Sequence, residues 1–260
     1  MKNFKAISSK ENSLIKLVCG LQSSSKTRRE NGLFVLEGLR ICDDALQNGI
    51  QFDKLIVTES LMEKFALQIE NFAENSAECY LVTESLFKKM SDTTSPQGII
   101  AVAKIPQNSD CKIDRNGKYI ALENLSDPSN LGAVSRTAEA LGVSGIIISD
   151  NSCDPYSPKV LRASMGTLLR MPVIILSDFA NKISTLGLKV YSCVVDNTAE
   201  KITEQNFKNG TVLIIGNEAN GITDETKKNS DKLITIEMSG KAESLNAAIA
   251  ASIAMWEMMK

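Results

Sequence analysis

Residues 123–136 combine small, turn-forming and amide side chains with a single arginine, and this stretch is the chain's strongest candidate for chemistry. Asp127-Pro128 is a turn signal, and Asn130 is predicted to be the N-cap of a helix that ends at Gly142. The helical period places Arg136 opposite the apolar face of that helix. Taken alone, this pattern favours an ordinary solvated arginine over a catalytic one.

A turn with a single carboxylate follows the apolar residues 212–215, which are predicted to form a buried strand. The turn spans residues 216–221 and carries Glu218. The glycine at each end permits positive φ and the close approach of a ligand to the backbone. The spacing alone does not exclude a plain strand-to-helix connection.

A third segment begins with the predicted strand 233–236 and continues into a polar loop. Ser244 and Asn246 stand near the end of this loop, and an alanine-rich helix is predicted from there to Met259. In isolation, a capped core helix explains the segment as well as a binding site does.

Short strands are also predicted before and around these segments. One, at residues 118–122, precedes the first candidate stretch, and residues 56–57, 79–82 and 99–102 form others that alternate with helical stretches. Residues 104–117 are polar and rich in turn formers, which is typical of a linker.

Several classes of site are excluded by composition. The chain has no histidine, which removes histidine-dependent triads, histidine general bases and H-E-x-x-H metal sites. Its six cysteines include no C-x-x-C pair, so we expect reduced thiols in a cytoplasmic protein and no metal site. No G-x-G-x-x-G turn follows a strand, which counts against a nucleotide-dependent enzyme on an ordinary doubly wound sheet. Neither a signal peptide nor a membrane span is predicted.

Positive charge is concentrated near the N-terminus, although the net charge is −2. Residues 1–40 carry eight Lys and Arg side chains against three Glu. The cluster of Lys26, Arg28 and Arg29 is a candidate phosphate-binding patch for RNA. On charge alone, a solvated surface turn is an equally good interpretation.

Together, the three segments resemble the SpoU family of S-adenosylmethionine-dependent RNA 2′-O-methyltransferases, the TrmH-like branch of the SPOUT superfamily. The family's motifs are N-x-x-D-P-x-N-x-G-x-x-x-R, G-x-E-x-x-G and I-x-M-x-G-x-x-x-S-L-N. They match this chain at Asn124, Asp127, Pro128, Asn130, Gly132 and Arg136; at Gly216, Glu218 and Gly221; and at Ile236, Met238, Gly240, Ser244, Leu245 and Asn246. Residues 162–173 look like the family's R-x-S-x-G segment leading into a strand.

The resemblance implies an α/β fold with two domains. Residues 1–106 would form a small RNA substrate-binding domain similar to ribosomal RNA-binding proteins, and residues 107–117 a linker. Residues 118–260 would form the methyltransferase domain, a parallel sheet whose C-terminal segment is threaded into a trefoil knot. In relatives the C-terminal helix also builds part of a homodimer interface, and the predicted helix here is apolar almost all round.

The resemblance also assigns roles to particular residues. S-adenosylmethionine is the implied cofactor, and the implied catalytic residues are Arg136, Asn130, Glu218, Ser244 and Asn246. The implied cofactor-binding residues are Gly216, Asn217, Ile236, Met238 and Leu245. Because a guanidinium is effectively never deprotonated, we expect Arg136 to clamp a phosphate and stabilise a developing alkoxide rather than act as a simple base.

The expected substrate is RNA, with 23S ribosomal RNA and a guanosine 2′-hydroxyl favoured. The extra N-terminal domain is the reason, since relatives that act on transfer RNA often lack it. Two alternatives stay open: a transfer RNA 2′-O-methyltransferase, and a non-catalytic RNA-binding protein of the same fold. The intact motif residues count against the second alternative.

Overall fold

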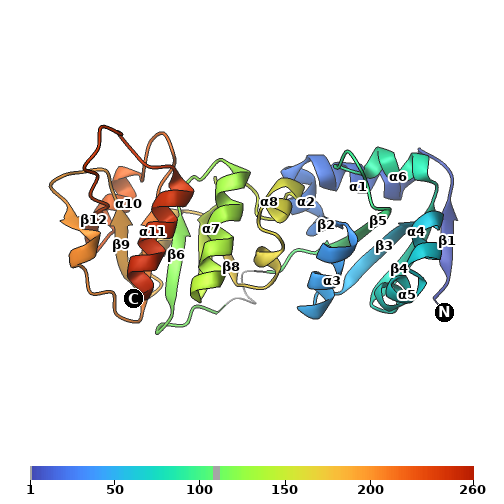
Figure 1. Ribbon diagram of the computed structural model, residues 1–260, viewed down its shortest axis with the longest axis horizontal. Coiled ribbons are helices and arrows are strands. Elements are labelled where there is room, and N and C mark those ends of the chain that lie inside the picture. Colours follow the sequence, from blue (N-terminus) through green and yellow to red (C-terminus); the bar gives the residue numbers. More distant parts are fainter. Residues whose placement is uncertain (1, 108–111) are drawn as a thin grey trace. The chain divides into compact units, whose positions relative to one another are not determined.

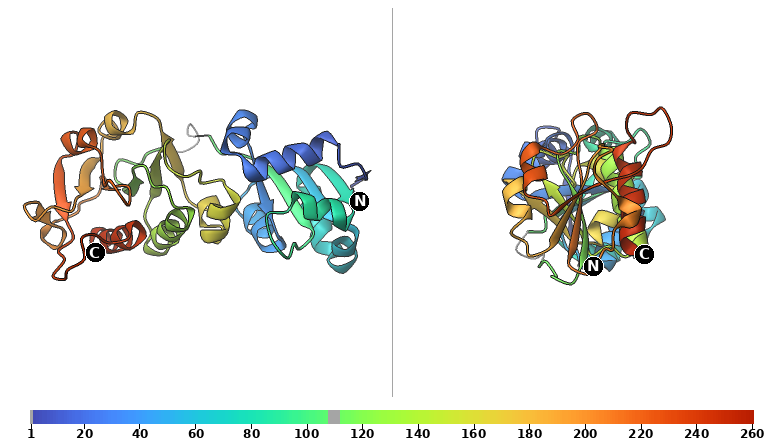
Figure 2. Two further views of the ribbon diagram at one scale, coloured as in Figure 1. Left: turned by 90° about the horizontal axis from the view of Figure 1, so that it is seen from above. Right: turned by 90° about the vertical axis from the view of Figure 1, so that its left-hand side faces the viewer.

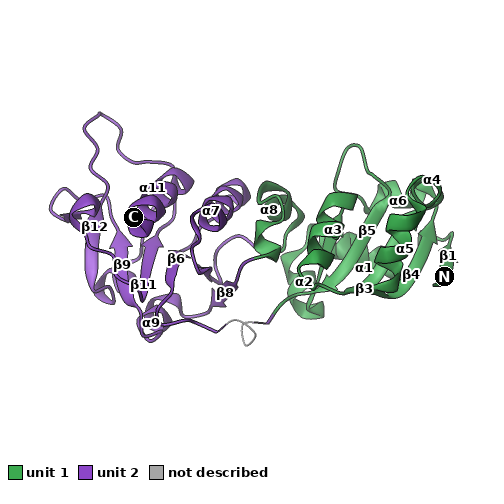
Figure 3. Cartoon of the chain, turned by 60° about the horizontal axis from the view of Figure 1, so that its bottom comes forward, with its two compact units in different colours: residues 1–106, 156–170 green, residues 107–155, 171–260 purple. Residues whose placement is uncertain are grey.

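The computed structural model describes residues 2–107 and 112–260 and divides the chain into two compact units. Unit 1 comprises residues 1–106 and 156–170, and unit 2 comprises residues 107–155 and 171–260 (Figure 3). The segment 156–170, which holds the R-x-S-x-G residues, therefore packs with unit 1. Residues 108–111 of the predicted linker 107–117 lie outside the described residues.

Unit 1 is built on a five-stranded mixed sheet in the order β1-β4-β3-β5-β2. Its strands are β1 (Phe4–Ile7), β2 (Leu33–Glu37), β3 (Phe52–Thr58), β4 (Ser76–Val82) and β5 (Ile99–Lys104). Its α-helices are α1 (Ser13–Ser23), α2 (Ser25–Asn31), α3 (Leu39–Gln47), α4 (Glu59–Lys64), α5 (Ala66–Glu74), α6 (Glu84–Met90) and α8 (Pro158–Ala163). The sheet predictions at residues 56–57, 79–82 and 99–102 are confirmed as parts of β3, β4 and β5.

The core of unit 1 lies where helices cover the sheet. Apolar side chains of α1 and α6, such as Val18 and Phe87, pack on Val35, Ile56 and Val102 of the strands, and all five are buried. β5 runs antiparallel to β2 and β3, and the other pairings are parallel.

Unit 2 is a seven-stranded parallel sheet in the order β10-β12-β9-β11-β6-β7-β8 (Figure 1). Its strands are β6 (Lys118–Leu122), β7 (Gly145–Ser149), β8 (Val173–Leu176), β9 (Lys189–Cys193), β10 (Glu200–Lys201), β11 (Thr211–Ile215) and β12 (Lys232–Thr235). Its α-helices are α7 (Pro128–Leu141), α9 (Phe179–Ile183), α10 (Asp224–Lys228) and α11 (Ala247–Met259). Every residue of β7 and β11 is buried, as expected for a parallel sheet covered on both faces.

The two longest helices of unit 2 lie side by side against the sheet (Figure 2). α11 contacts α7, β6 and β11, and the hydroxyls of Thr137 and Ser252 lie 3.2 Å apart across the helix pair. α11 begins at Asn246, whose side-chain oxygen accepts from the backbone N–H groups of Ala248 and Ile249. In the described part of the chain, no helix is both long and apolar enough to cross a membrane.

The start of α7 differs from the sequence prediction. Its N-cap is Asp127, whose side chain accepts from the N–H of Ser129, and Pro128 is the first helical residue. Asn130 is therefore inside the first turn, and its prediction as the N-cap is wrong. The reason is that proline has a fixed φ and no N–H to satisfy, so it favours the first helical position. The predicted end at Gly142 is confirmed, with φ of +73°.

Candidate active site

The three candidate segments meet at one edge of the unit 2 sheet. They follow β6, β11 and β12, which correspond to the predicted strands 118–122, 212–215 and 233–236. β6 pairs with β11, and β9 joins β11 to β12, all in parallel. Parallel strands present their carboxyl ends at the same edge, which is where ligands bind in α/β sheets.

A chain of hydrogen bonds connects the three segments. Asn246 donates from Nδ2 to Oδ1 of Asn130 at 3.0 Å, and Asn130 donates from Nδ2 to Oε1 of Glu218 at 2.7 Å. Ser126 donates to the other oxygen of Glu218 at 3.2 Å. Asn130, which is 7% exposed, thus links helix α11 to the turn after β11.

The carboxylate of Glu218 is held in its ionised form. Burial acts to raise its pKa, but the hydrogen bonds donated by Asn130 and Ser126 outweigh burial and leave the pKa below the ordinary value. Glu218 is therefore an anchored acceptor at neutral pH and a weak base.

The turn at residues 216–221 is fixed by its own hydrogen bonds. The backbone groups of Asn217 and Gly221 exchange two bonds, of 3.0 and 2.9 Å, and the side chain of Asn217 donates to the carbonyl of Asn124 at 2.8 Å. Gly221 has φ of +66°, as its residue type permits. Gly216 is required for a steric reason instead: a Cβ atom there would lie 2.1 Å from the carbonyl carbon of Gly221.

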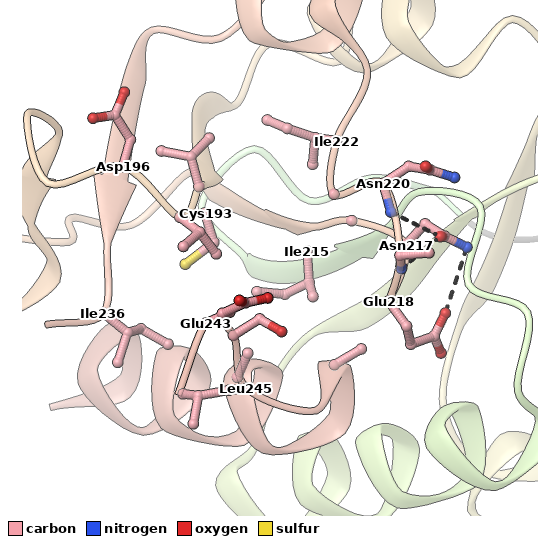
Figure 4. A pocket seen from close by; sticks show the side chains of 18 of the residues that line it. Cys193, Asp196, Ile215, Asn217, Glu218, Asn220, Ile222, Ile236, Glu243 and Leu245 are labelled. Atoms are coloured by element: carbon pink, nitrogen blue, oxygen red, sulfur yellow. Dashed lines mark hydrogen bonds between the residues drawn. The ribbon is translucent and has the colours of Figure 1, made fainter. Parts of the chain in front are cut away.

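A cavity of about 520 Å³ opens beside this turn (Figure 4). All five predicted cofactor-binding residues line it, together with Glu218 and Ser244: these five are Gly216, Asn217, Ile236, Met238 and Leu245. The sequence analysis missed the segment 193–196 at the carboxyl end of β9, as well as Lys227 and Glu243. The apolar residues around Tyr191 were the signal for β9, since a strand there ends at the same edge.

The cavity suits a nucleoside that carries an amino-acid chain. Its walls combine apolar side chains, such as Ile215 and Leu245, with the carboxylates of Asp196 and Glu243 (Figure 4). Among the described residues, none from Met238 to Leu245 forms a hydrogen bond with another residue, so this wall retains free N–H and C=O groups. An adenine ring, ribose hydroxyls and an ammonium group are the partners that such a lining satisfies. S-adenosylmethionine has all three.

Arg136 lies outside this cavity lining and is exposed on α7. Its side chain makes no hydrogen bond or ion pair with any residue that the structure describes. Its five N–H donors are therefore available to an external acceptor such as a phosphate.

Two cysteines lie close to the site but are not nucleophiles. Burial, followed by the negative charge of Glu218, raises the pKa of Cys153 to about 12, and burial raises the pKa of Cys193 to about 12. Both remain thiols at neutral pH, and the thiolate is the reactive form of cysteine. Within the described residues, no group of three or more Cys, Asp and Glu side chains is arranged to hold a metal ion.

The predicted RNA patch of unit 1 is only partly available. Lys26 and Arg29 are exposed on α2, and Lys26 lies 3.7 Å from the Glu30 carboxylate. Arg28 is 4% exposed, and its guanidinium donates to the carbonyl of Leu21. The prediction that Arg28 contacts phosphates is wrong, because its side chain is folded onto the end of α1.

Two protein-family models match this chain, one in each half. Residues 117–256 match the model of the SpoU rRNA Methylase family, and residues 12–101 match that of the MRM3-like substrate binding domain. An uncharacterised tRNA/rRNA methyltransferase of Synechocystis sp. is 32% identical over 97% of this chain and 92% of its own length. The 23S rRNA (guanosine(2553)-2′-O)-methyltransferase RlmP of Bacillus subtilis is 29% identical over 90% of this chain and 92% of its own.

Solved structures are similar along almost the whole chain. The AdoMet-bound rRNA methyltransferase of Sinorhizobium meliloti is 28% identical and superimposes with a TM-score of 0.83. The superposition covers 98% of this chain and 97% of that one.

Proposed function

This chain belongs to the SpoU rRNA methylase family and is an S-adenosylmethionine-dependent RNA 2′-O-methyltransferase, and we propose that its substrate is 23S ribosomal RNA, methylated on the ribose of a guanosine. The similarity to RlmP over nine tenths of both chains supports ribosomal RNA over transfer RNA. The match of residues 12–101 to a substrate-binding domain supports a large structured RNA as the target.

The hydrogen-bonded chain of Asn246, Asn130 and Glu218 is the observation that carries the assignment. It ties the first turn of α7, the turn after β11 and the start of α11 together beside the cavity. A protein that only bound RNA would gain nothing from a nucleoside cavity joined in this way to a helix that displays a free arginine.

The chemistry requires few groups from the protein. The methyl group of the sulfonium cofactor is already electrophilic, so the protein has to place the 2′-oxygen in line and stabilise it as it loses its proton. Arg136 stays protonated and serves as a donor to the phosphate next to the target ribose and to the developing alkoxide. The proton passes to a neighbouring acceptor such as water.

The remaining motif residues position the reacting groups. Glu218 and Asn246 hold the amide of Asn130 from both sides, which fixes the first turn of α7 and thereby the helix that carries Arg136. Ser244 lines the cavity and orients the ribose. Gly216, Asn217, Ile236, Met238 and Leu245, which line the cavity, would hold the cofactor.

Methyl transfer from radiolabelled S-adenosylmethionine tests this function. Ribosomal and transfer RNA from cells that lack the gene are incubated with the protein, and 2′-O-methylated positions are mapped by their resistance to alkaline cleavage. The expected result is one new site in 23S ribosomal RNA, at a guanosine. Label that enters only transfer RNA would assign the protein to the alternative substrate, and label on a base would overturn ribose methylation.

A homodimer formed through α11 is part of the proposal. Ile249, Ile253 and Trp256 are 52%, 36% and 56% exposed and recur at a spacing of four and three residues, so they form one apolar stripe on this helix. A second copy of the chain would bury the stripe. Light scattering should give twice the mass of one chain, and Trp256→Glu should give the mass of one. The trefoil knot implied by the resemblance and the cytoplasmic location expected from the cysteine pattern stay predictions.

A further inference from the structure

Unit 1 contains a second cavity, of about 320 Å³, whose lining includes none of the residues of the candidate active site. It is lined by the end of β2, part of α3, the loop before β5, and α8 with the residues that follow it, all within unit 1. Cavities of this size are within the range that binds small groups in proteins.

The acidic side chains at this cavity are all occupied internally. Glu37 accepts hydrogen bonds from four groups, namely Gln22 Nε2 at 3.1 Å, Asp92 N at 3.0 Å, Thr93 Oγ1 at 2.8 Å and the hydroxyl of Ser91. Asp44 pairs with Arg170 at 3.0 Å, and the lining residue Arg162 is itself neutralised by Asp92 at 2.7 Å. These carboxylates therefore have little capacity left to attract a cationic ligand.

Two other side chains of the cavity lining, Arg40 and Gln97, have unused hydrogen-bond donors. The side chain of Arg40 is exposed and, within the described residues, has no hydrogen-bond or ion-pair partner. Gln97 uses its side-chain oxygen to accept from the N–H of Leu39 at 2.9 Å, which leaves its NH₂ group free. The cavity thus offers one cation and one amide donor to a ligand that must supply acceptors.

An apolar surface completes the cavity. Met165 is 47% exposed and has φ of +52°, a conformation that residues other than glycine rarely adopt. The next residue is Gly166, where a Cβ atom would lie 2.9 Å from a carboxylate oxygen of Asp44. A backbone conformation of this kind persists only where the surrounding structure imposes it. Here this conformation places Met165 in the cavity lining. Thioether sulfur makes favourable contacts with aromatic rings.

From these observations we propose that the cavity binds one unpaired nucleotide of the substrate RNA. The base would lie against Met165, the Gln97 amide would donate to an acceptor on the base edge, and Arg40 would contact the adjoining phosphate. Bases in a duplex are stacked and cannot enter a concave site, whereas those of loops and bulges can. This inference rests on the proposed function, because it makes the cavity a recognition site for the same RNA.

Binding of short RNAs tests the site separately from methyl transfer. The probe is a fluorescent unpaired RNA of about ten mixed nucleotides, compared with its perfect duplex. Arg40→Ala and Gln97→Glu should each weaken binding of the unpaired RNA about tenfold, the effect expected when the protein no longer binds one base or one phosphate. Gln97→Glu keeps the oxygen that caps Leu39. Binding of the duplex should stay the same.

Lys64→Ala is the matched control, since it removes one exposed positive charge from unit 1 outside the cavity. It should change the affinity for either RNA by about twofold or less. An equal loss for duplex and unpaired RNA in Arg40→Ala, or no loss for either, would overturn the proposal.

Methionine-methyl NMR locates the RNA independently of the variants. The Met165 resonance, identified by its loss in Met165→Leu, should shift when the unpaired RNA is added, and an unmoved resonance contradicts the inference. If wild-type protein transfers no methyl group to ribosomal RNA, the proposed function fails, even where this resonance shifts. If methyl transfer proceeds and Arg40→Ala has an unchanged KM for RNA, only the cavity proposal fails.

Discussion

Helix α7 of unit 2 and helix α2 of unit 1 each carry an arginine that the sequence analysis selected, and the two side chains have different environments. Arg136 on α7 is exposed, and its side chain has no partner among the described residues. Arg28 on α2 is buried and donates to the carbonyls of Leu21 and Gln22 in the last turn of α1. The basic cluster around Arg28 suggested a phosphate site, whereas Arg136 by itself suggested a solvated residue.

The difference shows that an arginine's role depends on whether the fold satisfies its donors. The last carbonyls of a helix lack partners within the helix and carry partial negative charge, so a guanidinium placed there is stabilising. Arg28 fills that position at the end of α1. Arg136 is in the middle of α7, where the backbone groups are already paired, and its donors remain available for a substrate.

The largest effect is expected from Arg136→Ala. Turnover should fall by at least about a hundredfold, roughly 2.7 kcal/mol in the activation barrier, while cofactor affinity and stability stay near wild type. Arg136→Lys should remain poor, because an ammonium group lacks the planar fork of the guanidinium. Single-turnover methylation of ribosomal RNA at saturating cofactor measures both variants. Near-normal turnover in Arg136→Ala would make the first motif structural.

Arg28→Ala should act on stability instead. Removing a buried charged donor leaves carbonyls of α1 unpaired, and we expect the free energy of unfolding to drop by about 2 kcal/mol. Urea denaturation followed by circular dichroism measures this change. Arg29→Ala, one residue further along α2 and exposed, is the control and should shift stability by less than about 0.5 kcal/mol. If both variants lowered the free energy of unfolding equally, Arg28 would have no special structural role compared with the exposed Arg29.

Glu218→Gln tests the carboxylate in the hydrogen-bond network that holds the first turn of α7. Because the folded pKa of Glu218 lies below its ordinary value, the carboxylate adds stability at neutral pH. That contribution is lost as the pH falls through the folded pKa, below about 4.5. As the pH falls from neutral into that range, the free energy of unfolding of wild type should decrease by the contribution of the Glu218 carboxylate. Glu218→Gln lacks this carboxylate and should not show that part of the decrease. Parallel thermal-unfolding curves against pH would contradict this expectation.

The smallest effect concerns the exposed part of the α2 cluster. Replacing Lys26 and Arg29 by Ala should flatten the salt dependence of RNA binding by up to about two counterions, one for each phosphate that the protein no longer neutralises. Cofactor affinity should not change, since the cofactor cavity is in unit 2. A salt slope equal to that of wild type would identify the cluster as a solvated surface.

Local sequence signals were reliable where they depended on a few neighbouring residues. The strands before the three motifs, the end of α7 at Gly142 and the extent of α11 were predictable, because apolar runs and glycine act through short-range geometry. The start of α7 was misplaced because Asp127 and Asn130 are both good caps, and only the position of Pro128 between them decides the choice. The strand β9 was missed, and with it one wall of the cofactor cavity.

By itself, the sequence determined the family, because three motifs occur in order at the family's spacings, and through that resemblance it implied the cofactor and part of the cavity lining. Tertiary structure decided which of these residues touch. Glu218 and Asn246 are 88 and 116 positions from Asn130, and only the parallel order of β6, β11 and β12 brings them within hydrogen-bond distance. The same holds for Arg28, since burial depends on how α2 packs against α1 and cannot be read from charge alone.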